Sequence, residues 1–216
     1  FWEGLYPSTL AVPASADMVR REITLAKQAG FNALRPWRKP QPPLILDLAD
    51  EMGILVIGCP PIECMNHWPE LSPQLEWRLS NEVEQLVLRD RNHACVPYWE
   101  ILNEVVRPAL GRLKHRLALL ARRHDPTRIV IDESGGWAGG AHYYLPYSSE
   151  PVLFNELHCY LRAPVDDSIY DFLRTVGTPT PESNLAVGMK AQAVTGKPTV
   201  VSEVGYGSLS DLPSDV

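Results

Sequence analysis

Two glutamates stand where apolar, strand-like runs of the chain end. Residues 96–102 form an apolar run that stops abruptly at Asn103-Glu104, and residues 198–202 form a second run that ends in Glu203. A buried parallel strand delivers the polar side chains at its carboxyl end to the rim of its sheet. Two carboxyl groups about 5–5.5 Å apart can hydrolyse a glycosidic bond with retention, since one attacks the anomeric carbon and the other protonates the leaving oxygen.

Other acidic side chains also lie near the ends of strand-like runs, so position alone does not single out this pair. They are Glu100, Asp132, Glu133 and Glu156. Because Glu104 and Glu203 are far apart in sequence, they can meet only if their strands converge at one face of a sheet. A barrel rim brings strand ends together in this way.

The hydrophobic pattern alternates between short apolar runs and amphipathic helices. It predicts strands at 3–6, 31–34, 54–57, 96–102, 129–131, 152–157 and 199–202. Helices are expected at 15–29, 43–52, 72–92, 108–125, 169–176 and 182–195, with a loop at 137–151. This rhythm indicates an α/β fold, and a (β/α)8 TIM barrel that lacks its eighth strand fits best. A doubly wound sheet is the alternative, but no glycine-rich phosphate loop follows the first strand.

Composition limits the partners of the chain. With 20 Lys and Arg against 26 Asp and Glu, the net charge is −6, which argues against nucleic acid or an anionic membrane as a partner. No apolar run approaches the roughly 20 residues of a membrane span. Residues 1–216 are predicted to form one domain, and a start at Phe1 suggests part of a longer multidomain chain. The compartment stays open between cytoplasm, periplasm and secretion.

The four cysteines are Cys59, Cys64, Cys95 and Cys159, and none forms a C-x-x-C pair. We predict buried free thiols, with a Cys59–Cys64 disulfide as the alternative. His67 lies near Cys64 but has no further ligands at useful spacing. No metal and no cofactor is therefore predicted.

Several motifs occur in a definite order along the chain. They are A-G-F-N-A-L-R (29–35), L-D-L-A-D-E-M-G-I-L-V-I (46–57), R-D-R-N-H (89–93), W-E-I-L-N-E (99–104), D-P-T-R (125–128), H-C-Y (158–160) and G-K-P-T-V-V-S-E-V-G-Y-G (196–207). Together they resemble the catalytic barrel of glycoside hydrolase family 2, the β-galactosidase, β-glucuronidase and β-mannosidase family. The resemblance covers nearly the whole chain, although family members commonly carry a histidine where this chain has Pro36-Trp37.

The resemblance assigns roles to the residues at the strand ends. It implies that Glu104 is the general acid/base and Glu203 the nucleophile, with Asn103 bonding the sugar 2-hydroxyl. Arg35 is expected beneath the nucleophile, where a cation keeps Glu203 ionised while Glu104 holds its proton. The alternative for Arg35 is a purely structural ion pair.

Further side chains are expected around this pair. His158 and Tyr160 would line the site, and Trp37 and Glu133 would contact the sugar. Three of these residues also have a purely structural interpretation. His158 would then be a buried histidine with satisfied hydrogen bonds, Tyr160 would take part in ordinary packing, and Trp37 would pack at the barrel rim. His93 is assigned to structure, because it precedes its strand and so lies at the opposite end of the barrel.

The resemblance implies a retaining exo-β-glycosidase that works without a cofactor. A β-galactoside or β-glucuronide is the expected substrate, with a β-mannoside as a further option. The implied partners are the carbohydrate, additional β-sandwich domains and a second copy of the chain. A non-catalytic carbohydrate-binding barrel and an endo-acting glycanase of the same clan are the alternative functions.

Overall fold

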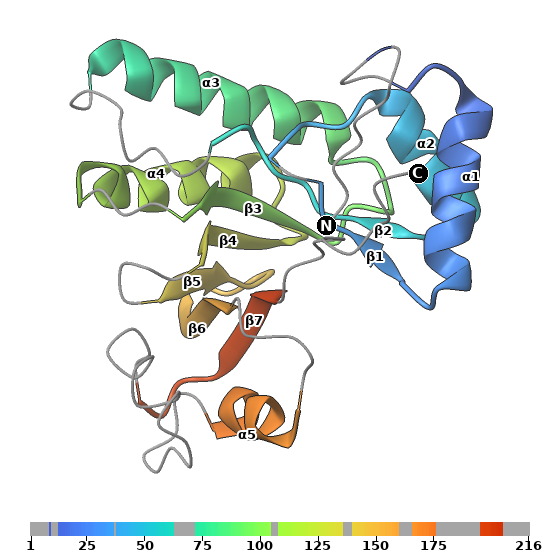
Figure 1. Ribbon diagram of the computed structural model, residues 1–216. Coiled ribbons are helices and arrows are strands. Elements are labelled where there is room, and N and C mark those ends of the chain that lie inside the picture. The colour runs from blue at the N-terminus through green and yellow to red at the C-terminus, as the bar shows by residue number, and fades with distance from the viewer. Residues whose placement is uncertain are drawn as a thin grey trace.

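Helices and strands alternate along the chain in the computed structural model (Figure 1). The structure describes residues 9, 13–36, 38–62, 72–104, 108–135, 140–159, 166–175 and 195–204. The helices are α1 (Ala16–Gln28), α2 (Pro43–Met52), α3 (Pro73–Asp90), α4 (Pro108–His124) and α5 (Asp167–Thr175). The strands are β1 (Ala33–Leu34), β2 (Leu55–Val56), β3 (Tyr98–Asn103), β4 (Ile129–Ser134), β5 (Ala141–Tyr144), β6 (Val152–Cys159) and β7 (Thr199–Val204).

Local sequence signals determine where three of these helices begin or end. The Ser15 hydroxyl accepts a hydrogen bond from the Met18 backbone N–H at the start of α1. Ser72 caps α3 in the same way and is followed by Pro73, which needs no hydrogen-bond acceptor at this position. Gly53 ends α2 at φ +68°, a left-handed conformation that glycine adopts without a Cβ penalty. The predicted starts and stops are confirmed here.

The strands follow one another across the sheet in chain order. β1 pairs with β2 in parallel, and β3 pairs with β4 in parallel. Gly58 joins the two parts, because its N–H donates to the Tyr98 carbonyl and its carbonyl accepts from the Glu100 N–H. A doubly wound sheet would reverse its strand order at a crossover, whereas sequential order is that of a barrel wall. The expected α/β barrel class is confirmed as part of such a barrel.

One strand was not predicted. Residues 141–144 form β5, which pairs antiparallel with both β4 and β6, so the prediction of a loop over 137–151 is wrong at these positions. β5 is only four residues long and follows a glycine, and it pairs on both sides with the strands that come before and after it in sequence, β4 and β6. Such pairing stabilises a strand that local sequence does not announce. The predicted strand at 3–6 and almost all of the helix at 182–195 lie outside the described residues, and the eighth strand is not tested.

The helices cover the sheet with their apolar faces. In Figure 1, α3 and α4 lie side by side with α4 next to β3 and β4, and α1 and α2 lie together beside β1 and β2. The buried side chains between these layers include Val83, Trp99, Ile101, Leu102 and Leu117. No helix in the described part of the chain has the length and apolar character needed to cross a membrane.

The amino ends of the strands are held by polar contacts with the preceding connections. The Arg128 guanidinium donates to the carbonyls of Arg91, His93 and Val96, which fixes the connection between α3 and β3. His93 lies in this connection, at the end of β3 opposite Asn103, as expected for a structural residue. Cys59 and Cys95 are buried free thiols, so the alternative of a Cys59–Cys64 disulfide is wrong.

Candidate active site

Polar side chains converge where the strands end. Arg35 follows β1, Asn103 and Glu104 close β3, and His158 and Glu203 lie near the ends of β6 and β7. These five residues were all expected in the site, and they form one connected network of hydrogen bonds and ion pairs.

The two glutamates both lie close to the same nitrogen of the His158 ring, Nδ1. Oxygen atoms of Glu104 and Glu203 and a nitrogen of His158 all lie within 4.8 Å of one another. This separation fits the about 5–5.5 Å of a nucleophile and acid/base pair, and it is shorter than the about 6.5–9.5 Å of inverting enzymes. The Glu203 side chain is fully buried, whereas that of Glu104 is 22% exposed. The more accessible carboxyl group is therefore Glu104.

His158 connects the two carboxyl groups. Its Nδ1 lies 2.5 Å from Oε1 of Glu104 and 3.4 Å from Oε2 of Glu203, and its Nε2 lies 3.0 Å from the Ser134 hydroxyl. Carboxylate oxygens only accept hydrogen bonds, so Nδ1 carries a proton when these groups are ionised. The β6–β7 register shifts between Leu157 and His158, and this irregularity pairs His158 with Glu203. Such bulges commonly redirect a side chain beside an active site.

Arg35 anchors the nucleophile candidate. Its Nη1 donates to Oε1 of Glu203 at 2.6 Å, and its Nη2 donates to Oδ1 of Asn103 at 2.8 Å. Burial alone would lower the pKa of Arg35, but the carboxylates of Glu100 and Glu203 outweigh burial and raise it above its ordinary value. The guanidinium is thus a permanent positive charge against Glu203.

Glu100 and Arg38 belong to the same network, although sequence analysis gave neither a role in the site. Glu100 accepts from Arg35 Nε at 3.0 Å and from Arg38 Nη1 at 2.7 Å, and it is 1% exposed. The available signal was an acidic residue in the middle of an apolar strand. A buried carboxylate of this kind needs charged partners, and Glu100 holds the Arg35 guanidinium in place from below.

Glu156 is a second carboxyl group beneath the site that was not assigned a role. It accepts hydrogen bonds from the Tyr143 hydroxyl and from Ser134 Oγ, the latter at 3.4 Å. Burial is the main cause that raises the pKa of Glu156 above its ordinary value. Burial thus disfavours the ionised form of Glu156 relative to that of an exposed glutamate.

Asn103 carries a buried donor, Nδ2, that is not used within the described residues. Arg35 can only donate, so Asn103 must face it with Oδ1, and its Nδ2 is left to point elsewhere. Within the described parts of the chain, Nδ2 is buried and has no hydrogen-bond partner. A buried donor without a partner is costly to leave unpaired, which suggests a group that is bonded only when a ligand is present.

Replacing Asn103 with Ala is expected to lower kcat/KM by about tenfold to a thousandfold, because it removes a donor to the sugar ring. The steady-state rate with an aryl β-glycoside and with its 2-deoxy analogue provides the measurement. If Asn103 bonds the 2-hydroxyl, the 2-deoxy substrate will lose much less than the parent sugar on mutation. An equal loss for both substrates would remove Asn103 from this role.

The backbone at the acid/base candidate is strained. Glu104 has φ +49°, which is uncommon for a residue with a Cβ, and its N–H donates to the Ser134 carbonyl at 2.9 Å. Gly135 has φ +102°, and a Cβ there would lie 3.2 Å from Glu104 Cγ and from the His158 ring. Gly135 therefore allows Glu104 and His158 to approach each other, a requirement that the sequence pattern did not reveal.

Three further predicted contacts remain to be placed. Glu133 is fully buried and forms an ion pair with Lys114 of α4, with Oε2 2.8 Å from Nζ. Glu133 thus contacts the helix layer, and its predicted contact with a sugar stays a prediction. Trp37 and Tyr160 lie outside the described residues, and their predicted contacts stay predictions.

Glu104, His158 and Glu203 are also close enough to one another, within 4.8 Å, to be considered as ligands of one metal ion. One ligand atom each from Glu104, His158 and Glu203 would suffice for three-fold coordination. Arg35 already places a positive charge at 2.6 Å from Glu203, so the site balances that carboxylate with its own residues.

Fold and site together define part of an α/β barrel, with a pair of carboxyl groups at the carboxyl ends of two of its strands, β3 and β7. The family model for glycosyl hydrolases family 2, TIM barrel domain, matches residues 13–204. The chain belongs to this family.

Individual relatives agree with that assignment. The chain is 38% identical over 124 residues to a β-galactosidase of Pectobacterium atrosepticum, covering 56% of this chain and 12% of the relative. It is 34% identical over 122 residues to a β-galactosidase of Vibrio cholerae, covering 55% of this chain and 12% of the relative. The chain therefore spans about an eighth of the length of these curated relatives.

Solved structures share the fold. A GH2 β-galacturonidase from Eisenbergiella tayi bound to glycerol has a TM-score of 0.70 at 21% identity, over 100% of this chain and 36% of that chain. A β-glucuronidase of Parabacteroides merdae has a TM-score of 0.53 at 23% identity, over 64% of this chain and 20% of that chain. These similarities support the barrel architecture.

Proposed function

We propose that the chain carries the catalytic site of a retaining exo-β-glycosidase, with Glu203 as nucleophile and Glu104 as general acid/base. The observation that carries the proposal is the approach of Glu104 and Glu203 to within 4.8 Å around His158. Membership of the family and the ion pair from Arg35 to Glu203 support it.

In the first step, a Glu203 oxygen attacks the anomeric carbon and forms a covalent glycosyl ester. The bond from that carbon to the leaving oxygen breaks, and the proton of Glu104 passes to this oxygen. Arg35 orients the Glu203 carboxylate through a contact of 2.6 Å. The greater exposure of Glu104 suits a group that must meet the leaving group and then water.

In the second step, Glu104 takes a proton from water, whose oxygen attacks the anomeric carbon. The ester bond breaks, and the Glu203 carboxylate is restored. Between the steps, His158 lies within reach of Glu104 at 2.5 Å and donates to its carboxylate while that group is ionised. Two displacements return the sugar with its original β configuration.

We infer a β-galactoside or a β-glucuronide as the substrate. The sequence relatives at 34–38% identity are β-galactosidases, and they favour the galactoside. A β-mannoside is the further option. Family relatives are much longer than this chain, which supports further domains in the complete protein.

The test measures hydrolysis of aryl β-glycosides of galactose, glucuronic acid and mannose by this chain, with NMR of the first anomer released. We expect the β anomer from the preferred sugar. Release of the α anomer would contradict retention. Binding of sugar without turnover would identify a non-catalytic barrel, and cleavage only within oligosaccharides would identify an endo-acting enzyme.

The Glu104→Ala variant distinguishes the acid/base from other roles. With a poor leaving group, kcat/KM is expected to fall by about 10²–10⁴-fold, because protonation of the leaving oxygen is lost. With a dinitrophenyl leaving group, the fall should be much smaller, since that group departs without a proton. An equal fall for both leaving groups would contradict the assignment of Glu104.

A further inference from the structure

A second group of potential ligands lies at the opposite end of the strands. Asp50 comes from the last part of α2, and His93 and Cys95 come from the connection between α3 and β3. The catalytic residues lie at the other end of β3, which at about 3.3 Å per residue is roughly 20 Å long. This group is therefore separate from the catalytic site, and the proposed reaction does not use it.

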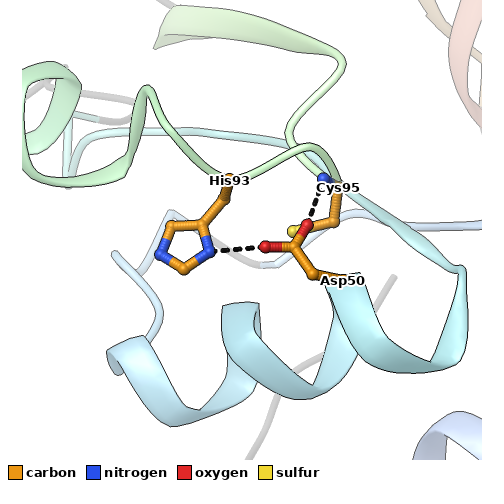
Figure 2. Close-up of side chains that lie close together, drawn as sticks. All are labelled: Asp50, His93 and Cys95. Carbon is orange, nitrogen blue, oxygen red and sulfur yellow. Dashed lines mark hydrogen bonds and ion pairs between the residues drawn. The ribbon is translucent and has the colours of Figure 1, made fainter.

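The three side chains point toward one another (Figure 2). Oδ2 of Asp50 lies 2.7 Å from Nδ1 of His93, and Oδ1 accepts the Cys95 backbone N–H at 2.6 Å. One ligand atom from each residue, including Cys95 Sγ, lies within 4.8 Å of the others. In Figure 2 the sulfur sits beside the Asp50 carboxylate.

The surroundings hold this arrangement in place and leave one side open. Three hydrogen bonds from Arg128 to backbone carbonyls fix the connection that carries His93 and Cys95. Cys95 is 4% exposed, whereas the side chains of His93 and Asp50 are 17% and 30% exposed. A small ion can thus enter from the Asp50 side, and water can complete its coordination.

We propose that Asp50, His93 and Cys95 form a binding site for a zinc-like divalent cation, with water as the fourth ligand. A thiolate, an imidazole and a carboxylate suit Zn²⁺, whereas Mg²⁺ and Ca²⁺ prefer oxygen ligands alone. Zinc bonds are about 2.3 Å long to sulfur and about 2.0–2.2 Å to nitrogen and oxygen, so the three ligand atoms, now within 4.8 Å of one another, must close around the ion.

Binding changes the protonation of two ligands. The cation replaces the thiol proton of Cys95, which is released to solvent, and His93 binds through Nδ1 with its proton on Nε2. The bound ion links α2 to the connection before β3, at a point where hydrogen bonds of Asp50 to His93 and Cys95 already join them. Because it binds only the folded chain, an ion at 100 times its Kd is expected to lower the unfolding equilibrium constant by about 100-fold.

Co²⁺ serves as the probe, because a thiolate ligand produces a charge-transfer absorption in the near ultraviolet. The full chain is titrated alongside Cys95→Ala and Cys59→Ala. Cys59 is a matched control, since its thiol is also buried and also donates to a backbone carbonyl, that of Pro36 at 3.3 Å. Binding at Glu104, His158 and Glu203 would give no such absorption, because that group contains no sulfur.

We expect one Co²⁺ per chain, with the absorption present in the parent and in Cys59→Ala and lost in Cys95→Ala. His93→Gln should weaken the affinity at least tenfold. Absence of the absorption in the parent, or its persistence in Cys95→Ala, would overturn the proposal. If Cys95→Ala does not fold, X-ray absorption of the Zn²⁺-loaded parent decides: one sulfur at about 2.3 Å supports the site, and none refutes it.

Discussion

Glu203→Gln is expected to lower kcat by at least about 10⁴-fold, because the amide cannot form the glycosyl ester. Loss of a catalytic nucleophile in other covalent enzymes costs on the order of 10⁴–10⁶ in kcat, and each factor of ten is about 1.4 kcal/mol of barrier. Glutamine keeps the size of the side chain and an acceptor oxygen for Arg35, which lies 2.6 Å away. The effect should therefore fall on chemistry rather than on folding.

The measurement is single-turnover hydrolysis with an activated aryl glycoside, combined with mass spectrometry after a fluoroglycoside inactivator. The parent should gain the mass of one glycosyl group on the peptide that contains Glu203, and the variant should not. Glu82→Gln on the exposed face of α3 is the matched control and should behave as the parent. Labelling of a different peptide would reassign the nucleophile.

Arg35→Met should both destabilise the chain and abolish most of its activity. Arg35 bridges Glu100, Glu203 and Asn103, and the two carboxylates are each 1% exposed. Removing one member of a buried charge network leaves its partners uncompensated, at a cost of about 3–5 kcal/mol in the free energy of unfolding. Methionine fills similar volume, so packing contributes little to the expected loss.

Urea unfolding and kcat are measured on Arg35→Met, Arg35→Lys and Arg20→Met. Lysine retains the charge but not the planar set of donors that reaches three partners, so Arg35→Lys should recover stability only in part. Arg20 forms an exposed ion pair with Glu51 on the surface, and its removal should leave the unfolding midpoint almost unchanged. An unchanged midpoint in Arg35→Met would show that the buried network does not stabilise the fold.

Much of the site followed from sequence because strand ends are a local property. Apolar runs that stop at Asn103-Glu104 and before Glu203 place those side chains at the carboxyl ends of parallel strands, where barrel sites form. The ordered motifs then added Arg35 and His158, and the structure brings both into contact with the glutamates.

The residues beneath the site could not be found in this way. In a regular strand, successive side chains point to opposite faces of the sheet, as Tyr98 and Glu100 do with their neighbours in β3. Ile101 and Leu102 are adjacent, yet both pack in the core cluster beneath the helices, so this alternation breaks at these two residues. In the neighbouring strand β4, Glu133 forms an ion pair with Lys114 of α4, a contact that the sequence pattern did not predict. Such a break in alternation depends on how the strand pairs with its neighbours. The sequence of one strand taken alone does not reveal this pairing.

The sequence by itself determined the class of fold, the family and the two glutamates, because hydrophobic period and motif order are properties of contiguous residues. Only the tertiary structure decided the approach of Glu104 and Glu203 to within 4.8 Å, the unpaired donor of Asn103 and the buried partners of Arg35. It also brought Asp50 of one helix to His93 and Cys95 of a distant connection. Such distances depend on strand register and barrel curvature, which arise only when separate segments pack together.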